Sequence, residues 1–168
     1  MSYVELAVTT NFSFLRGASH PQEFVVQAQS LGYPAIGIAD RNTLAGVVRA
    51  YDQWKQLDAA SRPRLLIGAR LVFRDGTPDI LAYPKDRKAY GWLSRLISVG
   101  KLRGKKGECL LDLQDLLTWR RGLLLIVMPP TANPQTLLPL LKILGRDTWL
   151  AASMLYTGED RRRLNALQ

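Results

Sequence analysis

The 168-residue sequence contains only one cysteine, Cys109, and only one histidine, His20. A single cysteine excludes an internal disulfide framework. A zinc site made of His and Cys side chains needs several such ligands, so this chain cannot supply one by itself. A carboxylate site for a hard cation such as Mg²⁺ stays open, because Asp and Glu residues are present.

Long apolar runs are also missing. The longest, such as 123–128, are far shorter than the roughly 20 residues that a membrane-spanning helix needs. The N-terminus lacks the basic and then apolar pattern of a signal peptide. Hydrophobic residues make up 47% of the chain, which favours a globular domain over a disordered one. We therefore expect a soluble, cytoplasmic protein with no membrane partner.

Acidic residues are scarce relative to basic ones. The chain has 23 Lys and Arg against 14 Asp and Glu, a net charge of +9. Such a balance favours a polyanionic partner, and nucleic acid first among these. Sixteen of the basic residues are Arg, so a compositional habit of the source genome is the alternative explanation. The charge alone does not decide between the two.

Apolar segments alternate with amphipathic ones along the whole chain. This alternation predicts a mostly parallel sheet with right-handed crossovers, either an open doubly wound sheet or a barrel. The absence of a G-x-G-x-x-G or Walker A motif weighs against a nucleotide-binding open sheet. Strands are predicted at 4–10, 35–39, 65–73, 80–83, 123–128 and 149–154, and helices at 19–31, from 42 or 43 to 54, 87–99, 112–119, 135–144 and from 159.

Capping and turn residues refine several of these boundaries. Ser19 followed by Gln22 resembles a capping box at the start of the first helix, and Gly32 is a plausible stop. Asp75-Gly76 predicts a turn that pairs the strands on either side. Asn42 or Thr43 is expected to open the second helix. Its expected apolar face consists of Leu44, Val47, Val48, Tyr51 and Trp54.

Functional sites of such folds lie where strands end and loops begin. Three sequence blocks at these places, VTTNFSFLRGASHPQEFV, AIGIADRNTLAGVVRAY and LLIGARLVF, resemble the start of the PHP domain, named after polymerase and histidinol phosphatase. FSFLRGASHP and ADRNTLAGVVRA are most similar to the error-prone, damage-inducible branch of the bacterial C-family DNA polymerases. The similarity continues through YPKDRKAYGWLSRLISVGKLRGKKGE, so it covers most of the chain.

The resemblance implies a PHP-type distorted (β/α) barrel of mostly parallel strands. In metal-binding members, a cluster of divalent ions at the C-terminal ends of the strands supports phosphoester hydrolysis, in some polymerases a 3'-5' exonuclease. In this sequence the positions of the family's ligands hold other residues. Ala7 and Thr9 stand in place of His-x-His, Arg16 in place of an acid or His, Arg41 in place of His, and Arg70 in place of Glu.

Arginine is always cationic and has no lone pair to give to a metal. The five degenerate positions therefore predict no metal and no catalytic residue in this cleft, where Asp40 is the retained acid. Two interpretations of Arg16, Arg41 and Arg70 stay open. They replace the metal charge and bind a phosphate or DNA backbone, or they pair with local acids such as Asp40. We favour the second interpretation.

A basic, glycine-containing segment adds a further candidate. Lys101, Arg103, Lys105 and Lys106 lie within six residues and are possible phosphate or DNA contacts. The alternative is a solvated run of charge.

A complete barrel of this kind needs about 250 residues. We therefore interpret residues 1–168 as a single PHP-like domain, incomplete because the chain is an N-terminal fragment of a much longer polymerase. Its expected partners are the rest of that chain, DNA and accessory mutagenesis proteins, and an open barrel edge predicts dimerisation of the fragment. No cofactor is expected here, whereas Mg²⁺ is expected in the downstream polymerase domain.

Three functions follow as hypotheses. The first is a non-catalytic scaffold domain of an error-prone DNA polymerase that acts in translesion synthesis, damage-induced mutagenesis and DNA repair. The second is a metal-dependent phosphoesterase or exonuclease with a rearranged site. The third is a module that binds the DNA backbone.

Overall fold

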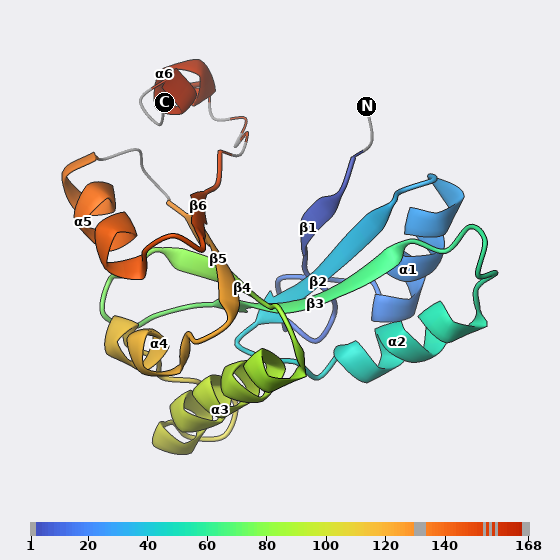
Figure 1. Ribbon diagram of the computed structural model, residues 1–168, viewed down its shortest axis with the longest axis horizontal. Helices are drawn as coiled ribbons and strands as arrows, with labels where there is room; N and C mark the ends of the chain where they lie inside the picture. The colour runs from blue at the N-terminus through green and yellow to red at the C-terminus, as the bar shows by residue number, and fades with distance from the viewer. Residues whose placement is uncertain (1–2, 130–133, 153, 155, 157, 166–168) are drawn as a thin grey trace.

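The computed structural model describes residues 3–165 except 130–133, 153, 155 and 157. Strands and helices follow one another along the described chain, as the alternating pattern predicts (Figure 1). The strands are β1 (Glu5–Val8), β2 (Ala35–Arg41), β3 (Arg64–Leu71), β4 (Asp79–Pro84), β5 (Leu123–Met128) and β6 (Thr148–Leu150). The helices are α1 (Pro21–Ser30), α2 (Val47–Gln56), α3 (Arg87–Arg103), α4 (Leu113–Trp119), α5 (Pro134–Leu144) and α6 (Asp160–Asn165).

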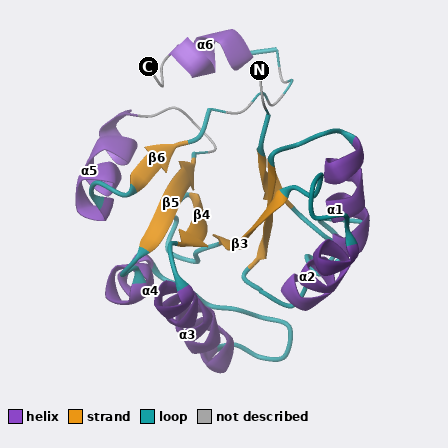
Figure 2. Cartoon of the chain, turned by 45° about the vertical axis from the view of Figure 1, so that its right-hand side comes forward, coloured by secondary structure: helices purple, strands orange, loops and turns teal. Residues whose placement is uncertain are grey.

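The strands form one sheet in the order β1-β2-β3-β4-β5-β6. β1, β2 and β3 are parallel, as are β5 and β6, whereas β4 is antiparallel to both of its neighbours. β3 and β4 form the predicted hairpin, in which Gly76 takes a positive φ of 83°. The sheet curls into a half-barrel with helices around its outside (Figure 2), which confirms the predicted α/β fold with an incomplete barrel.

Two apolar clusters hold the helices against the outer face of the sheet. Val8, Ile36 and Ile38 pack with Val25 of α1 and Ala50 of α2. The larger cluster joins β3, β4 and β5 to α3, α4 and α5, and its fully buried members include Leu71, Ile80, Leu93, Leu96, Leu116 and Val127. The strands are thus anchored from outside, which leaves the inner face of the curl to other residues.

Tyr83 of β4 fills the inside of the curl. Its hydroxyl donates a hydrogen bond of 2.5 Å to the carbonyl oxygen of Leu6 in β1, two strands beyond its sheet neighbour β3. Gly37 and Gly68 lie beneath the ring, where an added Cβ would collide with it. Burial raises the pKa of the Tyr83 phenol, so the group stays a neutral donor at neutral pH and ties β1 to β4.

Helices α1 and α2 begin later than predicted. α1 starts after His20, whose N–H donates to the Glu23 carboxylate at 2.8 Å, so the expected cap of Ser19 with Gln22 is wrong. Gly32 follows the helix with a φ of +67°, which confirms the stop. α2 starts at Val47 rather than near Asn42.

The late start of α2 has a tertiary cause. The side-chain amide of Asn42 bonds both the N–H and the carbonyl of Val72, at 2.9 and 3.1 Å, so it joins the strand ends and does not cap a helix. The expected apolar face is wrong in part, because Val48 and Tyr51 are exposed. The buried residues of α2 are Val47 and Ala50.

The tight fit under Tyr83 gives a test of the inner face. An added Cβ at Gly68 would lie 2.7 Å from both the Tyr83 ring and the Ala82 carbonyl oxygen. We expect Gly68→Ala to lower the free energy of unfolding by about 1–3 kcal/mol through overpacking. Urea unfolding measures the change, and Gly91→Ala in α3 is the control, because an added Cβ meets nothing within 4 Å there. Equal stability of the two variants would contradict this packing.

Candidate functional site

The buried carboxylate of Asp40, at the end of β2, organises the loop between β1 and α1. It accepts hydrogen bonds from the Thr10 N–H and hydroxyl, both at 2.8 Å, and from the Ser13 hydroxyl at 2.7 Å. Ser13 Oγ in turn accepts from the Arg41 N–H at 2.9 Å. Asp40 is 2% exposed, so these donors satisfy a charge that burial would otherwise penalise. The loop is thereby fastened to the carboxyl end of β2.

Beside this anchor, Thr9 and the three predicted arginines line one cavity of about 140 Å³. Arg41 and Arg70 are direct neighbours in the register of β2 and β3, and Arg16 reaches the cavity from the loop. The structure therefore brings together four of the five positions expected from the sequence. The fifth, Ala7, is exposed in β1.

The arginines differ in their partners. Arg70 Nε and Nη2 both lie 2.8 Å from Asp79 Oδ2, so this guanidinium has a carboxylate partner. Arg16 and Arg41 make no side-chain hydrogen bond or ion pair within the described part of the chain. The expected pairing with a local acid therefore holds for Arg70, but the choice of Asp40 as the partner is wrong, because Thr10 and Ser13 occupy it.

The residues of this cavity do not suit a metal ion. Three guanidinium groups carry no free lone pair, and they repel a divalent cation. Within residues 3–165, apart from the undescribed gaps, no group of three or more His, Cys, Asp or Glu side chains is placed to hold a metal. What the cavity offers is positive charge and N–H donors, which suit an anion.

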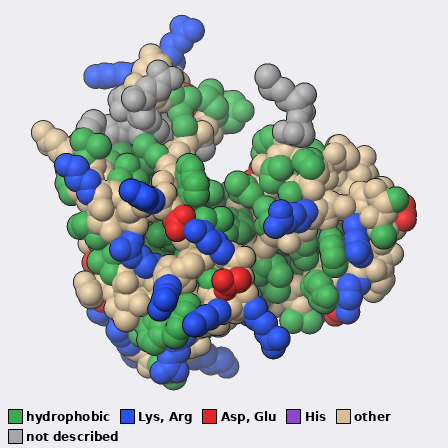
Figure 3. Space-filling model, viewed as in Figure 1, with side chains coloured by type: hydrophobic (Ala, Val, Ile, Leu, Met, Phe, Trp, Pro, Cys, Tyr) green, Lys and Arg blue, Asp and Glu red, His purple; other side chains and the backbone are tan. Residues whose placement is uncertain are grey.

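A larger groove of about 790 Å³ lies next to the cavity. Arg41 lines both, so its side chain borders the cavity as well as the groove. Phe12, Phe14 and Phe73 supply aromatic rings, and Phe14 is 84% exposed. The basic residues that line the groove are Arg41, Arg74, Lys101, Lys105 and Lys106. Lys and Arg side chains gather in the lower part of the face shown in Figure 3, near α3.

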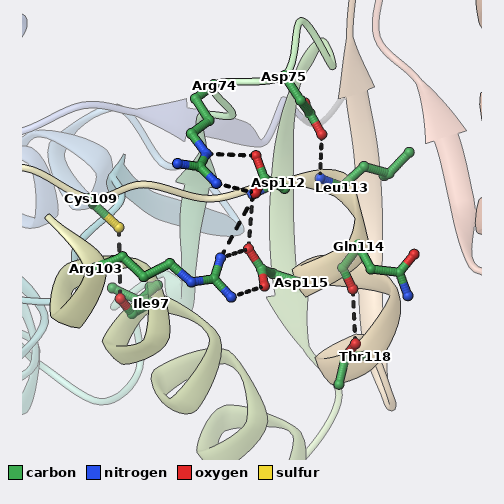
Figure 4. A network of polar contacts seen from close by, with 10 residues as sticks. All are labelled: Arg74, Asp75, Ile97, Arg103, Cys109, Asp112, Leu113, Gln114, Asp115 and Thr118. Carbon is green, nitrogen blue, oxygen red and sulfur yellow. Dashed lines mark hydrogen bonds and ion pairs between the residues drawn. The ribbon is translucent and has the colours of Figure 1, made fainter.

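Arg103 has a different role from its basic neighbours. Its Nη1 and Nη2 atoms lie 2.5 and 2.8 Å from the two oxygens of Asp115, while Arg74 forms a similar fork with Asp112 (Figure 4). The Asp112 N–H also donates to Asp115 at 2.9 Å. Hydrogen bonds from Arg103 and Arg74 hold the pKa of Asp115 and of Asp112, respectively, below the ordinary value. This network fixes the end of α3 against the start of α4, which positions the basic loop between them.

Thr10 and Ser13 lie within the first sequence block that is expected to contribute to the site, but sequence reasoning gives neither of them a role, and it does not identify Asp79. Thr10 and Ser13 carry a weak signal, since they are hydroxyl residues in a loop directly after a strand. Asp79 carries none, because its pairing with Arg70 follows from the register of the β3–β4 hairpin.

Comparison with known proteins places the chain in a family. A family model of the PHP domain matches residues 5–153. Over 172 aligned residues the chain is 56% identical to an error-prone DNA polymerase of Rhodopseudomonas palustris (strain BisB5), covering 99% of this chain and 16% of that protein. An error-prone DNA polymerase of Bradyrhizobium diazoefficiens is 51% identical, with 99% and 15% covered. The chain belongs to the PHP domain family.

A solved structure has a similar fold. A structure from Bifidobacterium adolescentis, described as a candidate metal-dependent phosphoesterase, superimposes with a TM-score of 0.68 at 16% identity. The match covers 98% of this chain and 82% of that one. The particular proteins that the sequence matches at 51–56% identity are error-prone DNA polymerases, and the chain spans about a sixth of their length. No helix among the described residues is long and apolar enough to cross a membrane.

The Asp40 anchor gives a test of the site's construction. Replacing Asp40 by Asn turns one acceptor oxygen into a donor that faces hydroxyl and N–H groups. We expect the free energy of unfolding to fall by about 1–3 kcal/mol, and trypsin to cut faster after Arg16, whose side chain is exposed. Urea unfolding and timed proteolysis measure the two effects.

The matched control is Asp52→Asn, because Asp52 forms an exposed ion pair with Lys55 at 3.2 Å. Such a surface change stays within about 0.5 kcal/mol. If Asp40→Asn changes stability and proteolysis no more than Asp52→Asn does, Asp40 does not hold the loop.

Proposed function

We propose that this chain serves as a non-catalytic scaffold domain of an error-prone DNA polymerase. The observation that carries the proposal is the cavity lined by Thr9, Arg16, Arg41 and Arg70. By the family resemblance, metal-binding PHP domains hold their metal ligands at these positions. The surrounding framework is retained, including the Asp40 anchor and the curled sheet. A domain that keeps its framework but has replaced its ligands serves by contact with other parts of its protein.

The polymerase context sets the rest of the proposal. The relatives named error-prone DNA polymerase support a parent of that kind. We propose that this parent is a cytoplasmic nucleotidyltransferase that acts in translesion synthesis and DNA repair. Its Mg²⁺ would be bound in the polymerase region, and this chain would need no cofactor. Accessory mutagenesis proteins are further candidate partners.

The inner face of the half-barrel supports a role in contact with the rest of the polymerase. Leu66, Leu124, Ile126 and Met128 are only half-buried there, beside Tyr83. Apolar area left at an open curl favours burial against another chain segment. We propose that the following part of the polymerase covers this face, and that the isolated chain dimerises through it.

Metal content and hydrolysis test the non-catalytic assignment. We expect the chain, purified without chelator, to contain no stoichiometric metal by mass spectrometry. With Mn²⁺ or Zn²⁺ added, we expect no hydrolysis of p-nitrophenyl phosphate or of a 3'-labelled oligonucleotide, because the cavity offers guanidinium groups in place of ligands. Stoichiometric metal together with turnover that co-elutes with the chain would contradict the proposal and favour a phosphoesterase or exonuclease with a rearranged site.

Binding of the DNA backbone is the second candidate function, and the basic groove favours it. Lys101, Lys105 and Lys106 are exposed, and no side-chain ion pair engages them within the described residues. Arg103 is excluded from this set, because Asp115 occupies its guanidinium. Phe14 adds one exposed aromatic ring beside these cations, and aromatic rings beside cations are typical of surfaces that bind single strands.

Salt-dependent binding tests the groove. We expect a single-stranded 20-mer to bind in fluorescence anisotropy, with log K falling linearly against log salt concentration. Changing Lys101, Lys105 and Lys106 to Gln would reduce that slope by about 2, because each lost phosphate contact removes about 0.7. The control changes Lys55, Lys88 and Lys142 to Gln, which lowers the net charge equally away from the groove. Equal loss in both triple variants would mean that net charge acts alone and that the groove is not the site.

A further inference from the structure

Two positive charges in the arginine cavity lack a counter-charge. Asp79 neutralises Arg70, but Arg16 and Arg41 have no acidic partner within the described residues. The retained acid Asp40 is engaged by Thr10 and Ser13. Like charges held side by side repel one another unless an opposite charge lies near them. An anion that is not part of the described chain would supply this opposite charge.

The backbone holds these guanidinium groups close together. Arg41 and Arg70 are register partners on adjacent strands, which lie about 4.8 Å apart. Arg16 lies on a turn in which the N–H groups of Arg16 and Gly17 both donate to the carbonyl of Ser13, at 2.9 and 3.2 Å. Since Asp40 binds Ser13 directly, the turn that carries Arg16 is fixed to the same strand end as Arg41.

The volume of the cavity and its guanidinium groups indicate which kind of anion would bind. The cavity has a volume of about 140 Å³ and is bordered by only four residues, which suits a small ion. One tetrahedral oxyanion fits such a space, whereas a nucleic-acid duplex does not. Guanidinium forks match the oxygens of phosphate in pairs. Thr9 also lines the cavity, but its hydroxyl donates to the Ala7 carbonyl oxygen at 3.4 Å, so the arginines are the donors that the site offers.

We propose that Arg16, Arg41 and Arg70 form a metal-free oxyanion site that binds one phosphate group. Arg41 lines both the cavity and the basic groove, so a phosphate bound at Arg41 would lie next to the groove. A phosphate monoester carries close to two negative charges at pH 7, which matches the two guanidinium groups that have no acid. The site is independent of the scaffold role, because it depends only on the residues of this cavity.

Isothermal titration calorimetry of the 168-residue chain with inorganic phosphate, at fixed ionic strength, tests the proposal. We expect saturable binding at one site. Arg16→Gln and Arg41→Gln would each weaken it about tenfold or more, since a hydrogen bond to a charged group contributes that much. Neither side chain has a partner within the described residues, so both variants are expected to keep the fold, which thermal unfolding checks.

Arg64→Gln is the matched control. Arg64 is exposed at the opposite end of β3 from Arg70, and its replacement removes the same charge. We expect phosphate binding to Arg64→Gln to equal that of the parent. Absence of saturable binding to the parent would overturn the proposal, and so would an equal loss in Arg64→Gln and the two cavity variants.

The source of the phosphate is decided with oligonucleotides. A single strand with a terminal phosphate is compared with the same strand without one, against the parent and Arg41→Gln. Tighter binding of the phosphorylated strand that Arg41→Gln abolishes identifies the end of a nucleic-acid strand as the ligand. Equal binding of the two strands, together with Arg-dependent binding of inorganic phosphate, identifies free phosphate. Both outcomes support the oxyanion site.

Discussion

The buried carboxylate of Asp40 is the interaction on which the candidate site depends. It takes three hydrogen bonds from Thr10 and Ser13, and through them it fixes the loop that carries Arg16 against the strand end that carries Arg41. A carboxylate that is 2% exposed is stable only with such donors around it. The acid thus acts as a positioning residue for cations, and its charge is already satisfied within the loop.

The charges of this site are reversed with respect to a metal centre. A metal site surrounds a cation with acceptor side chains, whereas here the cationic groups are part of the chain and the acceptors are few. Asp79 balances Arg70, and the remaining positive charge faces the cavity. If the proposed oxyanion site binds phosphate, these strand ends present an anion-binding surface where the family resemblance places a cation-binding one. This reversal connects the predicted loss of metal ligands with the proposed affinity for phosphate.

Local sequence patterns, such as apolar runs and turn residues, predict much of the fold. They do not predict the contacts between segments that lie far apart in the sequence. The apolar run of β5 and the Asp75-Gly76 turn have strong local signals, and both are confirmed. The sequence predicts a helix start at Asn42 or Thr43, which is wrong because the Asn42 side chain binds Val72, 30 residues away. The pairing of Arg70 with Asp79, and the groove between the first loop and the α3–α4 loop, likewise follow from tertiary packing. The family resemblance identified which positions to inspect, and the structure showed how their charges are balanced.

A crystal structure of the chain grown with both Mn²⁺ and inorganic phosphate tests the central claim most directly. We expect tetrahedral density within hydrogen-bonding distance of Arg16, Arg41 and Arg70, and no anomalous Mn²⁺ peak in this cavity. A Mn²⁺ peak ligated inside the cavity, with the arginine side chains turned away, would show that the metal centre persists and would contradict the reversal of charge.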